Sequence, residues 1–200
     1  MGIILLGAMF LLTRETKFMV EQQKERIGKF KLARETADKI GKPLLVIGAP
    51  IDRPSADFLP KQIIRYIPLL NNFAMPQYPC GDITLDIDPI VKDQCPNAIV
   101  ADVKNIPLPD KSCGAVFLSH VLEHLSTIED FKKALSELHR VADYVFIAYP
   151  RKGGIIATCV PDHHLWMWEK PNGWLIEERA TGRREFITIK QNINHGYGAF

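Results

Sequence analysis

Short runs of mainly apolar residues alternate with longer mixed stretches along this chain. Four of these runs, residues 44–48, 98–101, 115–118 and 144–148, are typical of buried strands, and residues 82–86, where Ile83 and Leu85 alternate with polar residues, predict a fifth strand. Apolar positions at helical spacing predict helices over residues 14–40 and 128–141, and residues 61–70 predict a short helix between prolines. Strands that alternate with helices favour a parallel sheet. We therefore expect one α/β domain.

The C-terminal part of the chain has a weaker pattern. Residues 162–170 are rich in aromatic side chains and predict a helical turn, whereas residues 174–178 and 185–190 predict a hairpin around Thr181-Gly182. The predicted organisation has four parts: a short hydrophobic segment (1–13), an amphipathic helix (14–41), the α/β domain (42–193) and a loose tail (194–200).

The N-terminus is the most hydrophobic part, because residues 2–12 carry no polar side chain and Arg14 and Lys17 follow. A membrane span normally needs roughly 20 apolar residues, with a lower limit of about 17. Three interpretations stay open: a short membrane anchor, a helix that lies in the membrane interface or docks on the domain, and a signal peptide. We expect the anchor, that is, a transmembrane helix that attaches the protein to a membrane and leaves the domain on the cytoplasmic, positive side.

Composition adds little to this picture. A formal charge of +2 gives no reason to expect a nucleic-acid partner. The four cysteines are scattered without a CxxC pair, which predicts reduced thiols as in a cytosolic protein. Cys80 and Cys95 flank the second predicted strand, so the sequence leaves open whether their side chains meet.

Polar residues follow three of the predicted strands: Asp86, Asp102 and the pair Ser119-His120. Ligands of open parallel sheets bind outside the carboxyl ends of the strands, so we expect these side chains to line one crevice. An acidic residue at the end of a strand is suited to bind the hydroxyls of a ribose. The alternative for Asp86 is a turn or helix-capping role before Asp88-Pro89.

Three segments around these residues, 81–89, 101–110 and 114–125, resemble the Rossmann-like class I S-adenosylmethionine-dependent methyltransferases. The most distinctive is the run Ser-His-Val-Leu-Glu-His-Leu at 119–125. The resemblance implies a doubly wound, mostly parallel sheet, here with an N-terminal helix. It also implies S-adenosylmethionine as cofactor and methyl transfer to an unidentified acceptor, small or lipid-like, as the activity.

The same resemblance implies the cofactor-binding residues. Asp86 matches the residue that binds the ribose, and Asp102 matches the residue that accepts the adenine amino group. Val103 is then expected to offer its backbone N–H to the adenine ring. Gly48 after the first strand and Ser119 after the fourth complete the predicted cofactor site.

The loop after the first predicted strand departs from the family pattern. The family carries an acidic residue and several glycines there, whereas this chain has Val46, one glycine (Gly48) and Pro50, which has no backbone donor. The departure keeps a second hypothesis open: a non-catalytic, methyltransferase-like binding or scaffold protein that has lost the cofactor loop. A nicotinamide-dependent enzyme is disfavoured because no GxGxxG run exists.

Histidines supply the candidates for chemistry. His120 follows the fourth strand directly and is the predicted catalytic base. His120 and His124 also have the spacing of a two-histidine metal pair, but no third ligand is evident nearby, so we expect no metal and a packing role for His124. After the fifth strand, His163, His164 and Trp166 are predicted to bind the substrate; the alternative is an aromatic core cluster.

Overall fold

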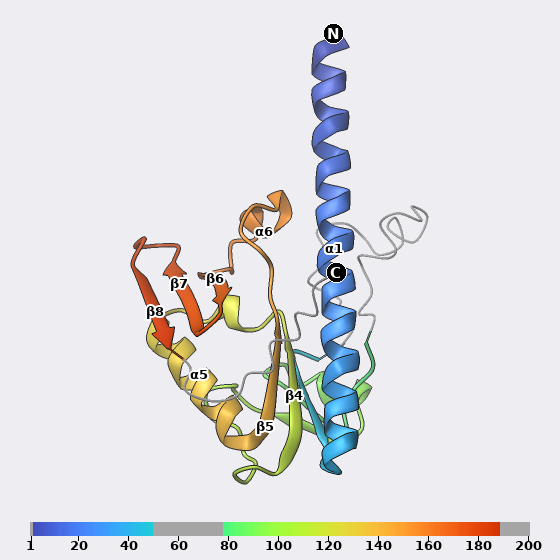
Figure 1. The fold of residues 1–200 in the computed structure, drawn as a ribbon, viewed down its shortest axis with the longest axis vertical. Coiled ribbons are helices and arrows are strands. Elements are labelled where there is room, and N and C mark those ends of the chain that lie inside the picture. Colours follow the sequence, from blue (N-terminus) through green and yellow to red (C-terminus); the bar gives the residue numbers. More distant parts are fainter. Residues whose placement is uncertain (1, 50–77, 189–200) are drawn as a thin grey trace.

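A five-stranded parallel sheet forms the centre of the protein in the computed structural model, which describes residues 2–49 and 78–188 (Figure 1). The strands are β1 (Leu44–Ile47), β2 (Ile83–Asp86), β3 (Ala98–Val100), β4 (Cys113–Ser119) and β5 (Ala142–Ala148). All five predicted strands are confirmed, with small shifts of their ends. The predicted Rossmann-like α/β fold with an N-terminal helix is confirmed as well.

The strand order β3-β2-β1-β4-β5 places a switch point at β1. From β1 the chain runs outward to β2 and β3, then returns to the other side of β1 to form β4 and β5. Ile47 at the end of β1 pairs with Leu85 on one side and with Leu118 on the other. The carboxyl ends of β1, β2 and β4 therefore meet at one edge, which is where ligands of such sheets bind.

Helix α1 (Gly2–Ile40) lies on one face of the sheet. The predicted hydrophobic segment and the predicted amphipathic helix are therefore one continuous element, whose N-terminal part projects beyond the sheet (Figure 1). Near its other end, Phe30, Ala33 and Ala37 are buried against β1, β4 and β5. The helix ends as predicted at Gly41, whose φ of +74° suits a glycine.

The expected membrane anchor gains no support from the helices. Within residues 2–49 and 78–188, no helix combines the length and the apolar character that crossing a membrane requires. The apolar stretch 2–12 is followed in the same helix by Arg14, Glu15 and Lys17, so the apolar part stays shorter than the roughly 17 residues that a span needs.

Helix α5 (Ile128–Val141) has the predicted bounds and covers the opposite face. Strand β1 separates the two faces by alternation: Leu45 and Ile47 belong to the core cluster that contains α5, whereas Leu44 and Val46 belong to the cluster that contains α1. Thr127 caps the start of α5 by accepting a hydrogen bond from the backbone N–H of Asp130. Two short helices, α4 (Val91–Gln94) and η1 (Leu122–His124), complete this part.

A small antiparallel sheet follows β5 and a short helix α6 (Ile155–Cys159). Its strands are β6 (Leu165–Lys170), β7 (Gly173–Glu178) and β8 (Arg184–Thr188). The predicted hairpin is confirmed by β7 and β8. The helical turn predicted for 162–170 is wrong: β6 is a strand, because its residues pair with β7 and because Leu165 and Met167, two positions apart, both enter the main core.

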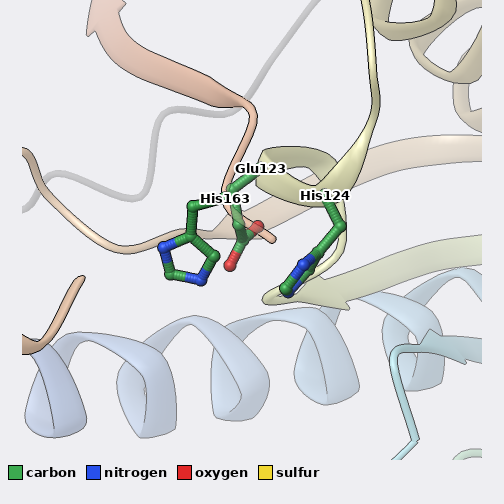
Figure 2. Close-up of side chains that lie close together, drawn as sticks. All are labelled: Glu123, His124 and His163. Atoms are coloured by element: carbon green, nitrogen blue, oxygen red, sulfur yellow. The ribbon is translucent and has the colours of Figure 1, made fainter. Parts of the chain in front are cut away.

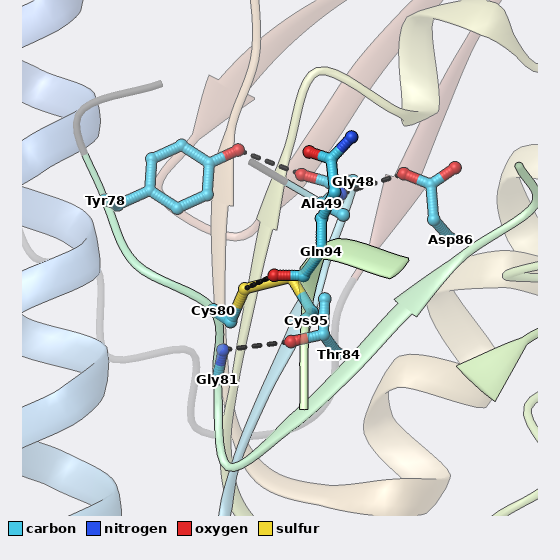
Figure 3. The surroundings of a disulfide bond; sticks show 9 residues. All are labelled: Gly48, Ala49, Tyr78, Cys80, Gly81, Thr84, Asp86, Gln94 and Cys95. Carbon is cyan, nitrogen blue, oxygen red and sulfur yellow. Dashed lines mark hydrogen bonds between the residues drawn. A yellow bond between two sulfur atoms is a disulfide. The ribbon is translucent and has the colours of Figure 1, made fainter. Parts of the chain in front are cut away.

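Two of the four cysteines form a disulfide, Cys80–Cys95, which corrects the expectation of reduced thiols for this pair (Figure 3). Their Cα atoms lie 5.7 Å apart because the segment entering β2 runs beside the end of α4. Cys113 and Cys159 are free, as expected. The helix predicted for 61–70 and the tail 194–200 lie outside the described residues.

Candidate functional site

A cavity of about 440 Å³ opens at the carboxyl edge of the sheet. Four of the five predicted cofactor residues line it: Gly48, Asp86, Asp102 and Val103. The segment that follows β4 closes the cavity with Val121, His124 and Leu125. Its size falls in the range of small-molecule sites, so the structure brings the predicted residues to one cavity of suitable dimensions.

Asp86 is almost fully buried at the end of β2, with 4% of its surface exposed. One carboxylate oxygen accepts a hydrogen bond from the backbone N–H of Ala49 at 2.8 Å, and the other accepts from the N–H of Asp88 at 2.9 Å. Figure 3 shows the bond to Ala49. The carboxylate thus fixes the loop after β1.

Gly48 lies where the loop after β1 approaches the end of β4 most closely. Its φ is +78°, and a Cβ atom at this position would lie 2.3 Å from the backbone oxygen of Ser119 and 2.6 Å from Cγ2 of Val121. Tyr78 donates a hydrogen bond from its hydroxyl to the Gly48 carbonyl at 2.9 Å (Figure 3). The single glycine that this loop retains therefore stands at a position that excludes side chains. Ser119 itself is buried and does not line the cavity.

Asp102 follows β3 and is more exposed than Asp86. One of its oxygens accepts a hydrogen bond from the backbone N–H of Lys104 at 2.8 Å, and the Lys104 ammonium lies 3.6 Å from the other. The same ammonium donates to Asp130 at 3.1 Å. The hydrogen bond to Asp130, together with the charge of Asp102, raises the pKa of Lys104. Lys104 thus places a cation at the rim of the cavity.

His120, the predicted catalytic residue, faces a different cavity. This second cavity, of about 270 Å³, lies between α1 and the segment after β5 and is lined by His120, Tyr149 and His163, among others. His120 has a φ of +54°, and its backbone N–H donates to the carbonyl of Ala148 at 3.0 Å. The chain turns sharply at this residue, so that His120 and His124 line different cavities.

Helix α1 supplies one wall of the second cavity, which the sequence pattern did not reveal. Met19, Gln22, Gln23 and Arg26 all line it. The Arg26 guanidinium lies 5.6 Å from the centre of the Tyr78 ring, and burial lowers the pKa of this arginine. Helical spacing places these residues on one side of α1, but only the docking of the helix shows that this side faces a cavity.

Glu123, His124 and His163 form a cluster between the two cavities (Figure 2). Each offers one ligand atom, and these three atoms all lie within 4.8 Å of one another. Glu123 is 1% exposed, and Nδ1 of His120 lies 3.1 Å from its Oε1. Burial acts to raise the pKa of Glu123, but His120, followed by His124, outweighs it and holds this pKa below its ordinary value. Burial also lowers the pKa of His163.

The other predicted substrate residues lie outside both cavities. His164 is exposed, and Trp166 is 4% exposed in β6. The Trp166 ring lies 4.9 Å from the Arg179 guanidinium carbon and 6.5 Å from the His163 ring. For Trp166 the structure favours the alternative interpretation, an aromatic core cluster, whereas His163 does line a cavity.

Sequence and structure comparisons bear on the same region. Residues 70–143 match the family model described as a methyltransferase domain. No curated protein matches the chain. A solved structure that resembles it is the crystal structure of PH0226 protein from Pyrococcus horikoshii OT3. The two share 12% sequence identity over 83% of this chain and 76% of that chain, with a TM-score of 0.38.

Proposed function

We propose, from the match of residues 70–143 to a methyltransferase-domain model, that this chain transfers a methyl group from S-adenosylmethionine to a small acceptor bound in the second cavity. One observation carries the proposal. Gly48, Asp86 and Asp102, which come from three different strand ends, converge on one cavity at the switch point of the sheet, and two of them lie inside the matched segment.

In this proposal the cavity lined by Gly48, Asp86 and Asp102, the first cavity, holds the adenosyl part of the donor. Asp86 accepts hydrogen bonds from the ribose hydroxyls. Asp102 accepts a hydrogen bond from the adenine amino group, and Val103 donates its backbone N–H to the ring. A cavity of about 440 Å³ is large enough for a nucleoside.

The acceptor occupies the second cavity. Methyl transfer moves the methyl group from the sulfonium to a lone pair of the acceptor and leaves the thioether product, so the protein contributes mainly in-line positioning. Where the acceptor must lose a proton, His120 takes it. The buried Glu123 carboxylate, 3.1 Å from Nδ1 of His120, stabilises the imidazolium that results.

The lining of this cavity combines polar groups with apolar side chains such as Met19 and Val160, which suits a small acceptor that has both a polar and an apolar part. Gln22, Gln23 and Arg26 present amide and guanidinium groups to it, and its volume is about 270 Å³. Burial of Arg26 disfavours its charged form, which an anionic or carbonyl group on the acceptor would compensate.

The loop after β1 favours the second candidate, a methyltransferase-like binding or scaffold protein. The Ala49 N–H is already bonded to Asp86, and Pro50 has no N–H, so this loop offers fewer donors than the glycine-rich loop of the family.

Titration with S-adenosylmethionine and with its demethylated product, S-adenosylhomocysteine, separates the two candidates. A donor-binding protein gains about 2.7 kcal/mol of stability at a ligand concentration 100 times the dissociation constant, which thermal unfolding detects. Adenosine alone serves as the control for the nucleoside part. Unchanged unfolding with all three ligands, together with no heat in calorimetry, would contradict the methyltransferase proposal and favour the scaffold protein.

A further inference from the structure

Glu123 places a carboxylate in the interior of the protein. The residue lies in η1, directly after β4, and is 1% exposed. Neither oxygen has an aligned hydrogen bond within the part of the chain that the structure describes, and Nδ1 of His120, 3.1 Å from Oε1, is the basic group that offsets part of the burial. A buried carboxylate is costly unless a cation or several donors compensate it. His120 approaches only Oε1, so the position also suits a cation beside the carboxylate.

Two imidazole rings beside Glu123 are oriented to act as metal ligands. Nδ1 of His124 lies 3.0 Å from the carbonyl oxygen of Asp162, and Nδ1 of His163 lies 3.0 Å from that of Ala157. A carbonyl oxygen only accepts, so each Nδ1 carries the proton and each neutral ring keeps its lone pair on Nε2. Histidines that bind metal ions are commonly held in this way, with the second ring nitrogen donating to a backbone carbonyl.

The backbone also brings the three residues together. The N–H of His164 donates to the carbonyl of Glu123 at 2.7 Å, which fastens the segment after α6 onto η1. The two imidazole rings lie 5.0 Å apart between centroids, and Figure 2 shows the carboxylate between them. Ligand atoms of a tetrahedral zinc site are about 3.4 Å apart. Since the three candidate atoms lie within 4.8 Å of one another, small side-chain movements close the site.

We propose that Glu123, His124 and His163 bind a divalent first-row transition ion, with Zn²⁺ as the representative. Two imidazoles and one carboxylate suit this class, whereas Mg²⁺ and Ca²⁺ prefer oxygen ligands throughout. Three protein ligands leave at least one coordination position open.

The open coordination position of the ion lies where the acceptor and the methyl donor would meet. His124 lines the first cavity and His163 lines the second, so the ion lies at the boundary between them. An oxygen or nitrogen of the acceptor that binds the ion is then held beside the methyl donor. This last step rests on the proposed function, but binding of the ion does not.

The test uses the full chain in a Cys159→Ser background, because Cys159 is an exposed free thiol and thiolates compete for zinc. The protein is treated with a chelator, dialysed and titrated with ZnCl₂ by calorimetry, and the bound metal is quantified after gel filtration. We expect one ion per chain. Removing a ligand with His163→Ala or Glu123→Gln is expected to weaken binding by more than about 100-fold, which exceeds the loss caused by removing a hydrogen-bond partner of a ligand.

The matched control is His164→Ala, which removes an exposed neighbour outside the cluster and should leave the affinity unchanged. Circular dichroism checks the fold of each variant. If a variant does not fold, the absorption spectrum of Co²⁺ bound to the parent protein tests the ligand set instead. Bands of a site with nitrogen and oxygen ligands, without a thiolate band, support the assignment.

Substoichiometric zinc, equal zinc affinity of folded His163→Ala and the control, or tighter binding of Mg²⁺ than of Zn²⁺ would each overturn the proposal. Binding of S-adenosylhomocysteine to the chelator-treated protein is measured separately. Failure of the metal site therefore leaves the proposed methyl transfer to be judged on its own.

Discussion

The carboxylate of Asp86 holds the backbone N–H of Ala49 at 2.8 Å, so the end of β2 fixes the loop that follows β1. This bond joins two segments that the sequence separates widely, and it lies at the wall of the larger cavity. The residue that the proposed function assigns to the ribose thus also shapes the loop beside it. A substitution at Asp86 has two separable effects, one on stability and one on ligand affinity.

We expect Asp86→Asn to weaken S-adenosylhomocysteine binding by about 1.5–3 kcal/mol, the range for hydrogen bonds to a charged group. The introduced amide keeps one acceptor oxygen and loses the other. Calorimetry measures the affinity, and thermal unfolding reports the effect on the loop. Asp88→Asn is the matched control, since Asp88 lines the same cavity. A larger loss of affinity for the Asp88 variant would move the ribose contact to that residue.

The second prediction concerns the adenine contact. Asp102→Asn preserves the oxygen that accepts from the Lys104 N–H, but it replaces the other oxygen with a donor. Two donors then face each other if the adenine amino group points there. We expect a loss of about 1.5–3 kcal/mol for adenosine-containing ligands and a smaller loss, or a gain, for the inosine analogue, whose carbonyl accepts. Equal effects on the two bases would place the adenine elsewhere.

Gly48 and Gly41 form a matched pair for the third prediction, because their φ angles are +78° and +74°. A Cβ at Gly41 meets nothing within 4 Å, whereas one at Gly48 meets the Ser119 carbonyl at 2.3 Å. Gly41→Ala should therefore lower the free energy of unfolding by about 1–2 kcal/mol, because alanine is strained only by the left-handed backbone conformation. Gly48→Ala should cost a further 1–3 kcal/mol or so from overpacking. Urea unfolding measures both variants, and equal losses would show that the loop after β1 moves freely away from β4.

The parallel sheet is predictable from the sequence because each of its strands carries a local signal. All four residues of β1 are buried, and a continuous apolar run is the mark of such a strand. Strand β6 was missed because its state depends on pairing with β7, a contact that no local pattern encodes. The larger cavity is predictable as well, because the polar residues that follow the strands are also a local sequence signal.

The rest of the site depends on tertiary contacts. The side of α1 that carries Gln22 and Arg26 lines a cavity only because the helix docks on the sheet. His124 lacked a third ligand in the sequence because His163 reaches it from the segment before β6, fastened there by a backbone hydrogen bond. The disulfide likewise joins residues 15 positions apart that meet only once β2 and α4 are in place.

That disulfide is the subject of the fourth prediction. Closing a loop of this length restricts the unfolded chain and stabilises the native state by about 3 kcal/mol. We expect the double variant Cys80→Ser/Cys95→Ser to lose about that much free energy of unfolding in urea, and reductant to affect the parent but not the variant. Cys159→Ser, which removes an exposed free thiol, is the control and should match the parent. An unchanged midpoint for the double variant would mean that the crosslink does not constrain the unfolded chain.

The last prediction concerns the pH dependence of stability through His139, which lies in the last turn of α5. Burial, followed by the nearby charge of Lys111, lowers the pKa of this histidine below its ordinary value. Its Nε2 is buried and has no hydrogen-bond partner among the described residues. Protonation in the folded state therefore places an uncompensated charge in the protein interior.

The direction of the effect follows from linkage. As the pH falls through about 6.5, the ordinary value for histidine, the unfolded chain binds a proton at His139 while the folded chain does not. The unfolded state then holds more protons, so the free energy of unfolding decreases as the pH falls, until the folded pKa is reached. His139→Gln, which does not titrate, should reduce this slope between pH 7 and 5 in urea titrations with a chelator present. His164→Gln, at an exposed position, should leave the slope as it is in the parent. A slope that His139→Gln does not change would assign the acid sensitivity to other groups.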